Sequence, residues 1–226
     1  GLTWSPPQLV FNAAEAGWSV LQDTQMVVDD AGTMHVLIAQ GALPPAVDPL
    51  GVYYLRSTDA GQTWTGPLPV SRPGSEAGYP RLIATRPGEL HRLWIEDFNG
   101  VWLVQHQWSV DDGRAWSAAA PVIGLRDTSH NLGLATDGSG ALYLVGVEAT
   151  DQQSAALFYL RWDGHTWVDR ETVPLGFGVD AASGASAALL PTGYRARSLG
   201  LDQCPRSRRR RPAIVWNERP WSATPR

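Results

Sequence analysis

The sequence contains no lysine, a single cysteine and no long hydrophobic run. Because Cys204 is the only cysteine, neither an intrachain disulfide nor a cysteine-based metal cluster can form. No apolar stretch reaches the roughly 18 residues of a membrane-spanning helix, and no charged segment followed by an apolar core marks a secretory leader. The five histidines show no metal-ligand spacing, and nucleotide-binding glycine patterns are missing, as is G-x-S-x-G. We therefore expect no metal, no cofactor and no membrane span.

The charges divide the chain into two parts. Residues 1–193 hold 9 arginines against 20 acidic residues, a formal net charge of −11. Residues 194–226 hold 9 arginines against 2 acidic residues, a net charge of +7. Such an asymmetry is typical of a basic interaction tail. We accordingly expect a folded domain over residues 1–193 and a separate arginine-rich tail over residues 194–226.

The sequence does contain a repeat. The segment S-T-D-A-G-Q-T-W at residues 57–64 recurs as S-V-D-D-G-R-A-W at 109–116 and, in degenerate form, as W-D-G-H-T-W at 162–167. These tryptophans and an earlier one in the opening G-L-T-W are spaced by 60, 52 and 51 positions. A second landmark keeps the same step: Gly32, Gly88, Gly140 and Gly193 are 56, 52 and 53 positions apart.

Each repeat carries the pattern of four short strands. Strand-like runs end just before the landmark glycines, at residues 25–29, 81–85, 133–137 and 186–190. In the first three repeats two alternating apolar stretches follow before the tryptophan motif opens a fourth strand. Four antiparallel strands in about fifty residues is the pattern of a propeller blade. The sequence therefore predicts an all-β fold, a fragment of a six-bladed β-propeller. It is expected to hold three full blades, a last strand of a preceding blade near residues 5–10, and the start of another blade.

The tryptophan motif resembles the Asp-box, or BNR repeat, of the sialidase (neuraminidase) superfamily and related propellers. The resemblance covers residues 1–193. It implies a carbohydrate-directed, exo-sialidase-like glycoside hydrolase that takes a carbohydrate or glycoconjugate and acts outside the cell or at its envelope. The alternative is a non-catalytic extracellular binding or scaffold propeller, and the resemblance leaves open whether the chain is an enzyme. The motif residues are expected to be structural; they are Ser57, Asp59, Gly61, Trp64, Ser109, Asp111, Gly113, Trp116, Asp163, Gly164 and Trp167.

In such propellers the motif turns lie on one face and the active site on the other, over the central channel. Glu96 and Glu148 hold the same place in consecutive repeats, just after the second strand, and two carboxylates near an arginine suit glycoside chemistry. The alternative interpretation is that both are exposed loop acids. The predicted catalytic residues are Glu96, Glu148 and Asp97, and the predicted substrate-binding residues are Arg81, Arg126 and Asn131.

The resemblance also implies features that the sequence matches only in part. A sialidase is expected to clamp a carboxylate with three arginines and to use a tyrosine paired with a glutamate. Tyr79-Pro80-Arg81-Leu82 places one arginine at the start of an inner strand, but in the wrong order for the family's F/Y-R-I-P motif. The alternative for Arg81 is a solvated channel arginine. His35 and His91 share one strand position and are expected to be packing residues.

The arginine-rich tail leaves three hypotheses open. A basic nucleic-acid or membrane patch would suit its charge, although no aromatic residues interleave the arginine run at 206–211. A disordered tail is the second. The third, an out-of-frame translation, accounts for the abrupt loss of the repeat after Gly193, and we favour it. We expect a monomer without a nucleic-acid partner.

Overall fold

The computed structural model describes residue 3 and residues 6–44, 48–124, 132–137, 140–149 and 154–175. Within these ranges the chain forms β-strands and no helix, so none of them holds a helix that could cross a membrane. The predicted tail at 194–226 lies outside the described residues. The strands are β1 (Val20–Val28), β2 (Met34–Gly41), β3 (Pro49–Ser57), β4 (Thr65–Pro69), β5 (Ala77–Arg86), β6 (Glu89–Phe98), β7 (Val101–Ser109), β8 (Ala120–Gly124), β9 (Leu132–Thr136), β10 (Leu142–Ala149), β11 (Ala155–Trp162) and β12 (Trp167–Leu175).

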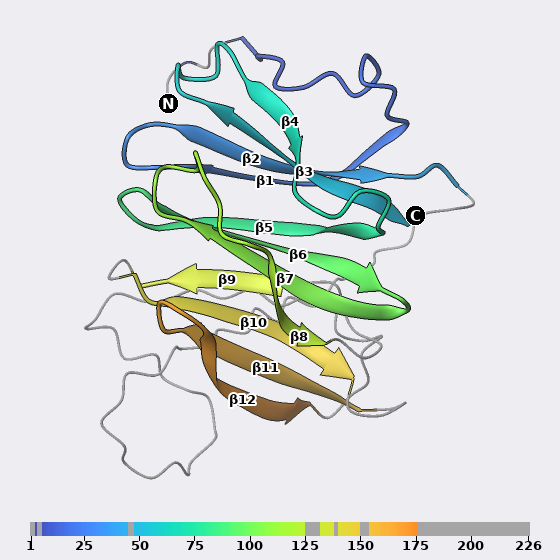
Figure 1. Ribbon diagram of the computed structural model, residues 1–226, viewed down its shortest axis with the longest axis vertical. Helices are drawn as coiled ribbons and strands as arrows, with labels where there is room; N and C mark the ends of the chain where they lie inside the picture. Colours follow the sequence, from blue (N-terminus) through green and yellow to red (C-terminus); the bar gives the residue numbers. More distant parts are fainter. Residues whose placement is uncertain are drawn as a thin grey trace, which may run out of the picture.

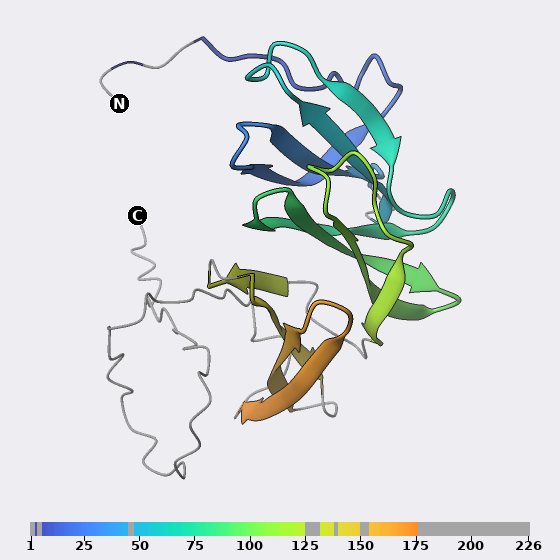
Figure 2. The same ribbon diagram turned by 60° about the vertical axis from the view of Figure 1, so that its left-hand side comes forward.

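The strands form three antiparallel sheets of four, each built in chain order from β1–β4, β5–β8 and β9–β12. We call them the first, second and third sheet. Their leading strands are neighbours in space, since β1 contacts β5 and β5 contacts β9. The sheets are stacked in Figure 1 and fan out from the side of these inner strands in Figure 2. The arrangement is consistent with consecutive blades of a propeller.

The strand positions predicted from the repeat are confirmed for all three sheets. The predicted inner strands at residues 25–29, 81–85 and 133–137 fall on β1, β5 and β9. The alternating stretches that follow each landmark glycine form the second and third strands. Tight turns with positive φ at Gly32, Gly88 and Gly140 join each inner strand to the next. These turns and the tryptophan motifs lie at the same end of the sheets, on the left in Figure 1.

The segment before β1 differs from the prediction. Residues 6–10 form no strand, whereas the repeat predicted the last strand of a blade there. Residues 6–19 instead cover the outer face of the first sheet, where Phe11 and Trp18 pack on a cluster of Val36, Ile38 and Leu55. The rings of Phe11 and Trp18 are 4.8 Å apart.

Two apolar clusters hold the sheets together. Leu37, Val52 and Tyr54 of the first sheet pack on residues of the second that include Trp94. Leu93, Ile95 and Val104 of the second sheet pack on β9, β10 and β11 of the third, where Phe158 is fully buried. Burial of this apolar area is the main stabilising contribution.

The two complete tryptophan motifs, residues 57–64 and 109–116, form turns with one hydrogen-bond network, and we call them the Asp turns. In each, the serine hydroxyl donates to the aspartate at 2.8 or 2.7 Å and accepts the glycine N–H at 2.9 Å. The same aspartate accepts a backbone N–H four residues later at 2.9 Å. The glycines have φ of 85° and 73°, which an L side chain rarely adopts. These contacts support a structural role for the Asp turns.

Buried histidines link the sheets at the Asp-turn end. His91 donates through Nε2 to Glu89 (2.9 Å), so its Nδ1 accepts from His106 Nε2 (3.0 Å). His106 Nδ1 in turn accepts from Trp167 Nε1 of the third sheet at 3.1 Å. The two bonds in which a ring nitrogen accepts, at His91 Nδ1 and His106 Nδ1, require neutral imidazoles with a defined tautomer. His35 and His91 are fully buried, so the predicted packing role is confirmed.

The first sheet holds a similar chain. His35 lies between the Asp29 carboxylate (3.0 Å) and the Tyr54 hydroxyl (2.6 Å). Burial lowers the pKa of His35 and His91, and it lowers the pKa of His106 to about 3. The folded protein therefore keeps these imidazoles neutral at pH values where an unfolded chain protonates them.

We expect the free energy of unfolding to decrease as the pH falls from 7 to 5. Below about pH 6.5 the unfolded chain binds protons that the buried histidines cannot, and this costs about 2 kcal/mol for His106 alone by pH 5. Urea denaturation at the two pH values measures the difference. H106Q should flatten the pH dependence, and an unfolding free energy that stays constant between pH 7 and 5 in the unmodified protein would contradict the assignment.

Candidate functional site

Glu96 and Asp97 lie within β6, because Asn99 and Gly100 form a tight two-residue turn to β7. The alternative interpretation of Glu96 as an exposed loop acid is therefore wrong; its exposed fraction is 1%. The Asp97 side chain accepts the Gly100 N–H at 2.8 Å and stabilises the turn. The end of β6 thus presents one buried and one turn-forming carboxylate.

The Glu96 carboxylate is occupied by four protein donors. Oε1 accepts the backbone N–H and the Nε–H of Arg72 (3.1 and 2.9 Å) and the Ser75 hydroxyl (2.7 Å). Oε2 accepts the indole N–H of Trp94 at 2.8 Å. These bonds hold the connection between the first and second sheets against β6. The catalytic role of Glu96 stays a prediction, and its contacts favour a positioning role.

A cleft of about 260 Å³ opens beside Glu96, on the face of the second sheet that carries Trp94. Arg72 lies at its mouth with its guanidinium 3.7 Å from the centre of the Phe98 ring. The side chain of Arg72 is 54% exposed. The cleft therefore offers a guanidinium held by an anion beneath it.

The remaining predicted residues are less closely grouped. Glu148 lies in β10 and pairs with Arg170 of β12, a half-exposed partner. Its position is the one Glu96 has in the second sheet, but glycine stands at 146 where Trp94 stands, so no indole reaches the carboxylate. Arg126 and Asn131 lie outside the described residues.

Arg81 lies on the inner strand β5 and spans two sheets. Its Nε donates to the carbonyl of Leu132 at the start of β9 (2.5 Å), and its Nη1 donates to the Pro80 carbonyl (2.8 Å). Burial lowers the pKa of Arg81, and the negative charge of Asp23 opposes this shift. The two carbonyls fix the guanidinium plane.

Two β-bulges bring further polar groups to the same end of the inner strands. In β1 the register shifts between Gln22 and Thr24, so Asp23 is the extra residue. In β5 it shifts between Gly78 and Arg81, around Tyr79, whose φ is 55°. Bulges re-aim side chains and are frequent beside active sites, and a bulky residue at positive φ is strained.

Asp23, Tyr79 and Arg81 form an electrostatically coupled group, which we call the inner-strand group. Burial raises the pKa of Tyr79, and the negative charges of Asp23 and Asp48 raise it further. Since Asp23 also acts on Arg81, its carboxylate lies within electrostatic reach of both side chains. The group combines an exposed carboxylate, a half-buried phenol and a fixed guanidinium at the end of the sheets opposite the Asp turns.

The residues predicted from the sequence include Arg81 but not Tyr79, and the substrate-binding role of Arg81 stays a prediction. The signal for Tyr79 was the following proline, which has no N–H for the sheet and so favours a bulge. The described residues hold no group of three His, Cys, Asp or Glu side chains able to bind a metal ion. What the group can do chemically is to bind an anionic, polyhydroxylated ligand and exchange protons with it.

No protein-family model and no curated protein matches the sequence. Among solved structures, the chain is similar to an α-L-arabinanase of Penicillium chrysogenum complexed with arabinobiose, with 16% identity and a TM-score of 0.49 over 76% of this chain and 55% of that one. It is similar to the NanB sialidase of Streptococcus pneumoniae, with 18% identity and a TM-score of 0.44 over 74% and 25%. An α-L-arabinofuranosidase of Fusarium graminearum gives 13% identity and a TM-score of 0.46 over 69% and 49%. The chain spans about half or less of the length of these proteins. With TM-scores below 0.5, these similarities do not assign an activity to the chain.

Proposed function

We propose that the three sheets are blades of an Asp-box β-propeller that binds an acidic carbohydrate at the inner-strand group. The observation that carries this proposal is the pair of bulges at Asp23 and Tyr79 on adjacent inner strands, where Asp23 acts electrostatically on both Tyr79 and Arg81. Two structural features support it: the leading strand of each sheet borders the next, and the Asp turns occupy the opposite end.

The chemistry of the group suits a sugar that carries a carboxylate. Arg81 would receive the carboxylate, because a guanidinium binds such a group through paired hydrogen bonds. The carbonyls of Leu132 and Pro80 hold its plane before the ligand arrives, and this lowers the ordering cost of binding. Asp23 would exchange a proton with the glycosidic oxygen, and Tyr79 would lie next to the reacting carbon.

A non-catalytic binding propeller is the second candidate, and the arginine content favours it. The resemblance to sialidases implies three arginines around a carboxylate. Within the described strands, β1 and β9 contain no arginine, and β5 contributes Arg81 at this end. Release of the fluorophore from a fluorogenic sialoside separates the two candidates, since the binding propeller would hold the compound without turnover.

We expect R81K to weaken binding of sialyllactose about 10- to 100-fold, the loss typical of a charge-assisted hydrogen bond. Lysine keeps the positive charge but cannot pair with both carboxylate oxygens. Isothermal titration with sialyllactose and with lactose measures the preference for the acidic sugar. D23N, which removes the charge and keeps the size, is the matched variant for the proton-exchanging group.

The preference for sialyllactose over lactose is the readout that a purely structural role would not move. R81K should bring the two affinities together while the protein stays folded by circular dichroism. Equal binding of both sugars by the unmodified protein, or a preference that survives R81K, would refute the assignment of Arg81.

A further inference from the structure

The third tryptophan motif is shorter than the two Asp turns. Trp162 pairs with Leu142 in the register in which Ser57 and Ser109 pair with the second strands of their own sheets. Trp162 therefore stands in place of the Asp-turn serine. From that position to the closing tryptophan there are seven steps in the Asp turns and five in the third motif, so two residues are missing.

The shortened turn leaves space between the second and third sheets. In the second Asp turn, Gly113 lies directly against the first sheet. A Cβ on Gly113 would overlap the Tyr54 hydroxyl oxygen and would stand 3.2 Å from the His35 ring. Apart from its two neighbours in the chain, the corresponding Gly164 has no atom of another residue within 4 Å of where a Cβ would stand. At this place the structure has a cleft of about 340 Å³, a size that accommodates a small ligand.

Aromatic rings form one side of the cleft. Trp162 is 5% exposed, and its ring centre lies 5.1 Å from that of Trp108, which is partly exposed. Trp162 also packs edge-on against His106 beneath, at 4.6 Å. These contacts fix the position of Trp162. Trp162 in turn packs against Trp108 and supports its partly exposed ring.

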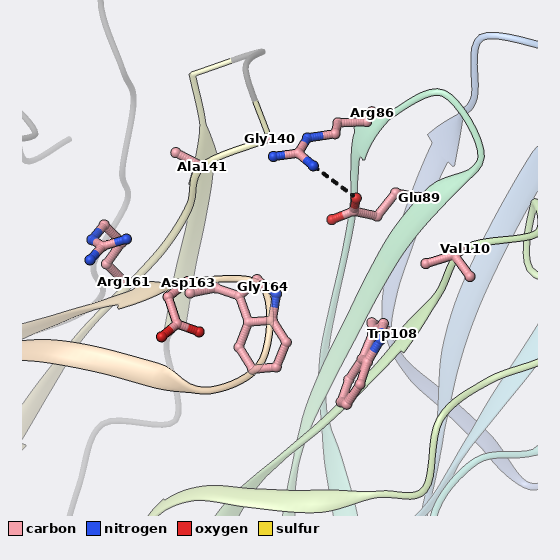
Figure 3. Close-up of a pocket in the computed structure, with 10 residues that line it drawn as sticks. Arg86, Glu89, Trp108, Val110, Gly140, Ala141, Arg161, Asp163 and Gly164 are labelled. Atoms are coloured by element: carbon pink, nitrogen blue, oxygen red, sulfur yellow. Dashed lines mark ion pairs between the residues drawn. The ribbon is translucent and has the colours of Figure 1, made fainter.

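Charged groups of both signs surround the aromatic pair. Arg86 and Glu89 lie on one side of the cleft and Arg161 and Asp163 on the other (Figure 3). Arg86 and Glu89 are 3.9 Å apart, and Arg161 is held by two hydrogen bonds to Asp169 at 2.9 and 2.8 Å. Because each arginine already faces a carboxylate, the rim favours a neutral ligand with alternating donors and acceptors over a simple anion.

We propose that this cleft, formed by Trp108, Trp162, Arg86, Glu89, Arg161 and Asp163, is a binding site for a neutral saccharide of one or two rings. The apolar face of a sugar ring packs on Trp108, and its hydroxyls reach the charged rim. The site lies at the Asp-turn end, opposite the inner-strand group. It is independent of the proposed function.

Saturation-transfer NMR with cellobiose, lactose and arabinobiose tests the proposal, because this method detects weak binding of small sugars. We expect transfer to at least one of them, weakened about tenfold by W108A, as for the loss of one aromatic contact. A141L fills the cleft without removing a partner, and it should abolish the transfer. V101A changes an exposed side chain at the other end of β7 and should leave the transfer unchanged.

Two results would overturn the proposal. One is the absence of transfer to all three sugars. The other is saturation transfer that persists in folded A141L. This variant is decisive because it fills the cleft, whereas W108A removes a packed side chain. Binding of inorganic phosphate in the cleft, together with no saturation transfer to any of the three sugars, would identify an anion site. This result would also reject the saccharide proposal.

Discussion

G113A should lower the free energy of unfolding by about 3 kcal/mol. The φ of 73° at Gly113 costs an L residue about 1 kcal/mol. A Cβ would also overlap the Tyr54 hydroxyl oxygen. Tyr54 cannot move aside easily, because it is 2% exposed, bonded to His35 at 2.6 Å and packed edge-on against Trp116. Overpacking of this kind adds about 1–3 kcal/mol.

G164A is the matched control for G113A. Gly164 has a φ of 106° and occupies the corresponding turn of the third sheet, but it lies in open space. The substitution should therefore cost only the backbone term of about 1 kcal/mol. Chemical denaturation of both variants gives the comparison. Equal losses would show that the second Asp turn does not pack on the first sheet as described.

E96A should destabilise the protein by about 3 kcal/mol, whereas E148A should cost less than about 1 kcal/mol. Removing the Glu96 carboxylate leaves the buried indole N–H of Trp94 and the backbone N–H of Arg72 without their acceptor, and each buried unsatisfied donor is costly. Glu148 pairs with the half-exposed Arg170, and exposed ion pairs contribute little.

Thermal and urea denaturation of the two variants test this difference directly. E96Q serves as a further control, because it keeps the size of the side chain and one carbonyl acceptor, so its loss should be intermediate. If E148A were as destabilising as E96A, the buried network around Glu96 would not be what distinguishes the two positions.

The strand order could be predicted from the sequence because two landmarks recur in every repeat. Gly32, Gly88 and Gly140 mark the turn after each inner strand, and the tryptophan motifs mark the turn before each fourth strand. Period-two alternation between these landmarks then locates the strands. Residues 6–10 were predicted as a strand because their local pattern resembles one, but strand formation also requires a pairing partner.

The candidate site could be predicted only in part. Arg81 was found because it follows a strand-start pattern, whereas the burial of Glu96 depends on Arg72, Ser75 and Trp94, which approach it only in the folded chain. Bulges displace residues by one position, and simple alternation does not reveal them. For this reason Asp23 and Tyr79 come together in space without any shared sequence motif.

The degenerate third motif shows how a shortened repeat changes the packing between two sheets. Its two missing residues and the replacement of serine by Trp162 remove the contact that Gly113 makes in the second Asp turn. The resulting cleft is where we place a second saccharide site. The two complete Asp turns stabilise the packing of the sheets, and the shortened one opens it.

The most direct test of the inner-strand assignment is a titration of the isotopically labelled protein with sialyllactose, followed residue by residue by NMR. The proposal predicts that the amide signals of Asp23, Tyr79 and Arg81 shift together with one affinity, and that those of the Asp turns at 57–64 and 109–116 stay in place. Shifts confined to the Asp-turn end, or no shift on β1 and β5 at saturating ligand, would contradict it.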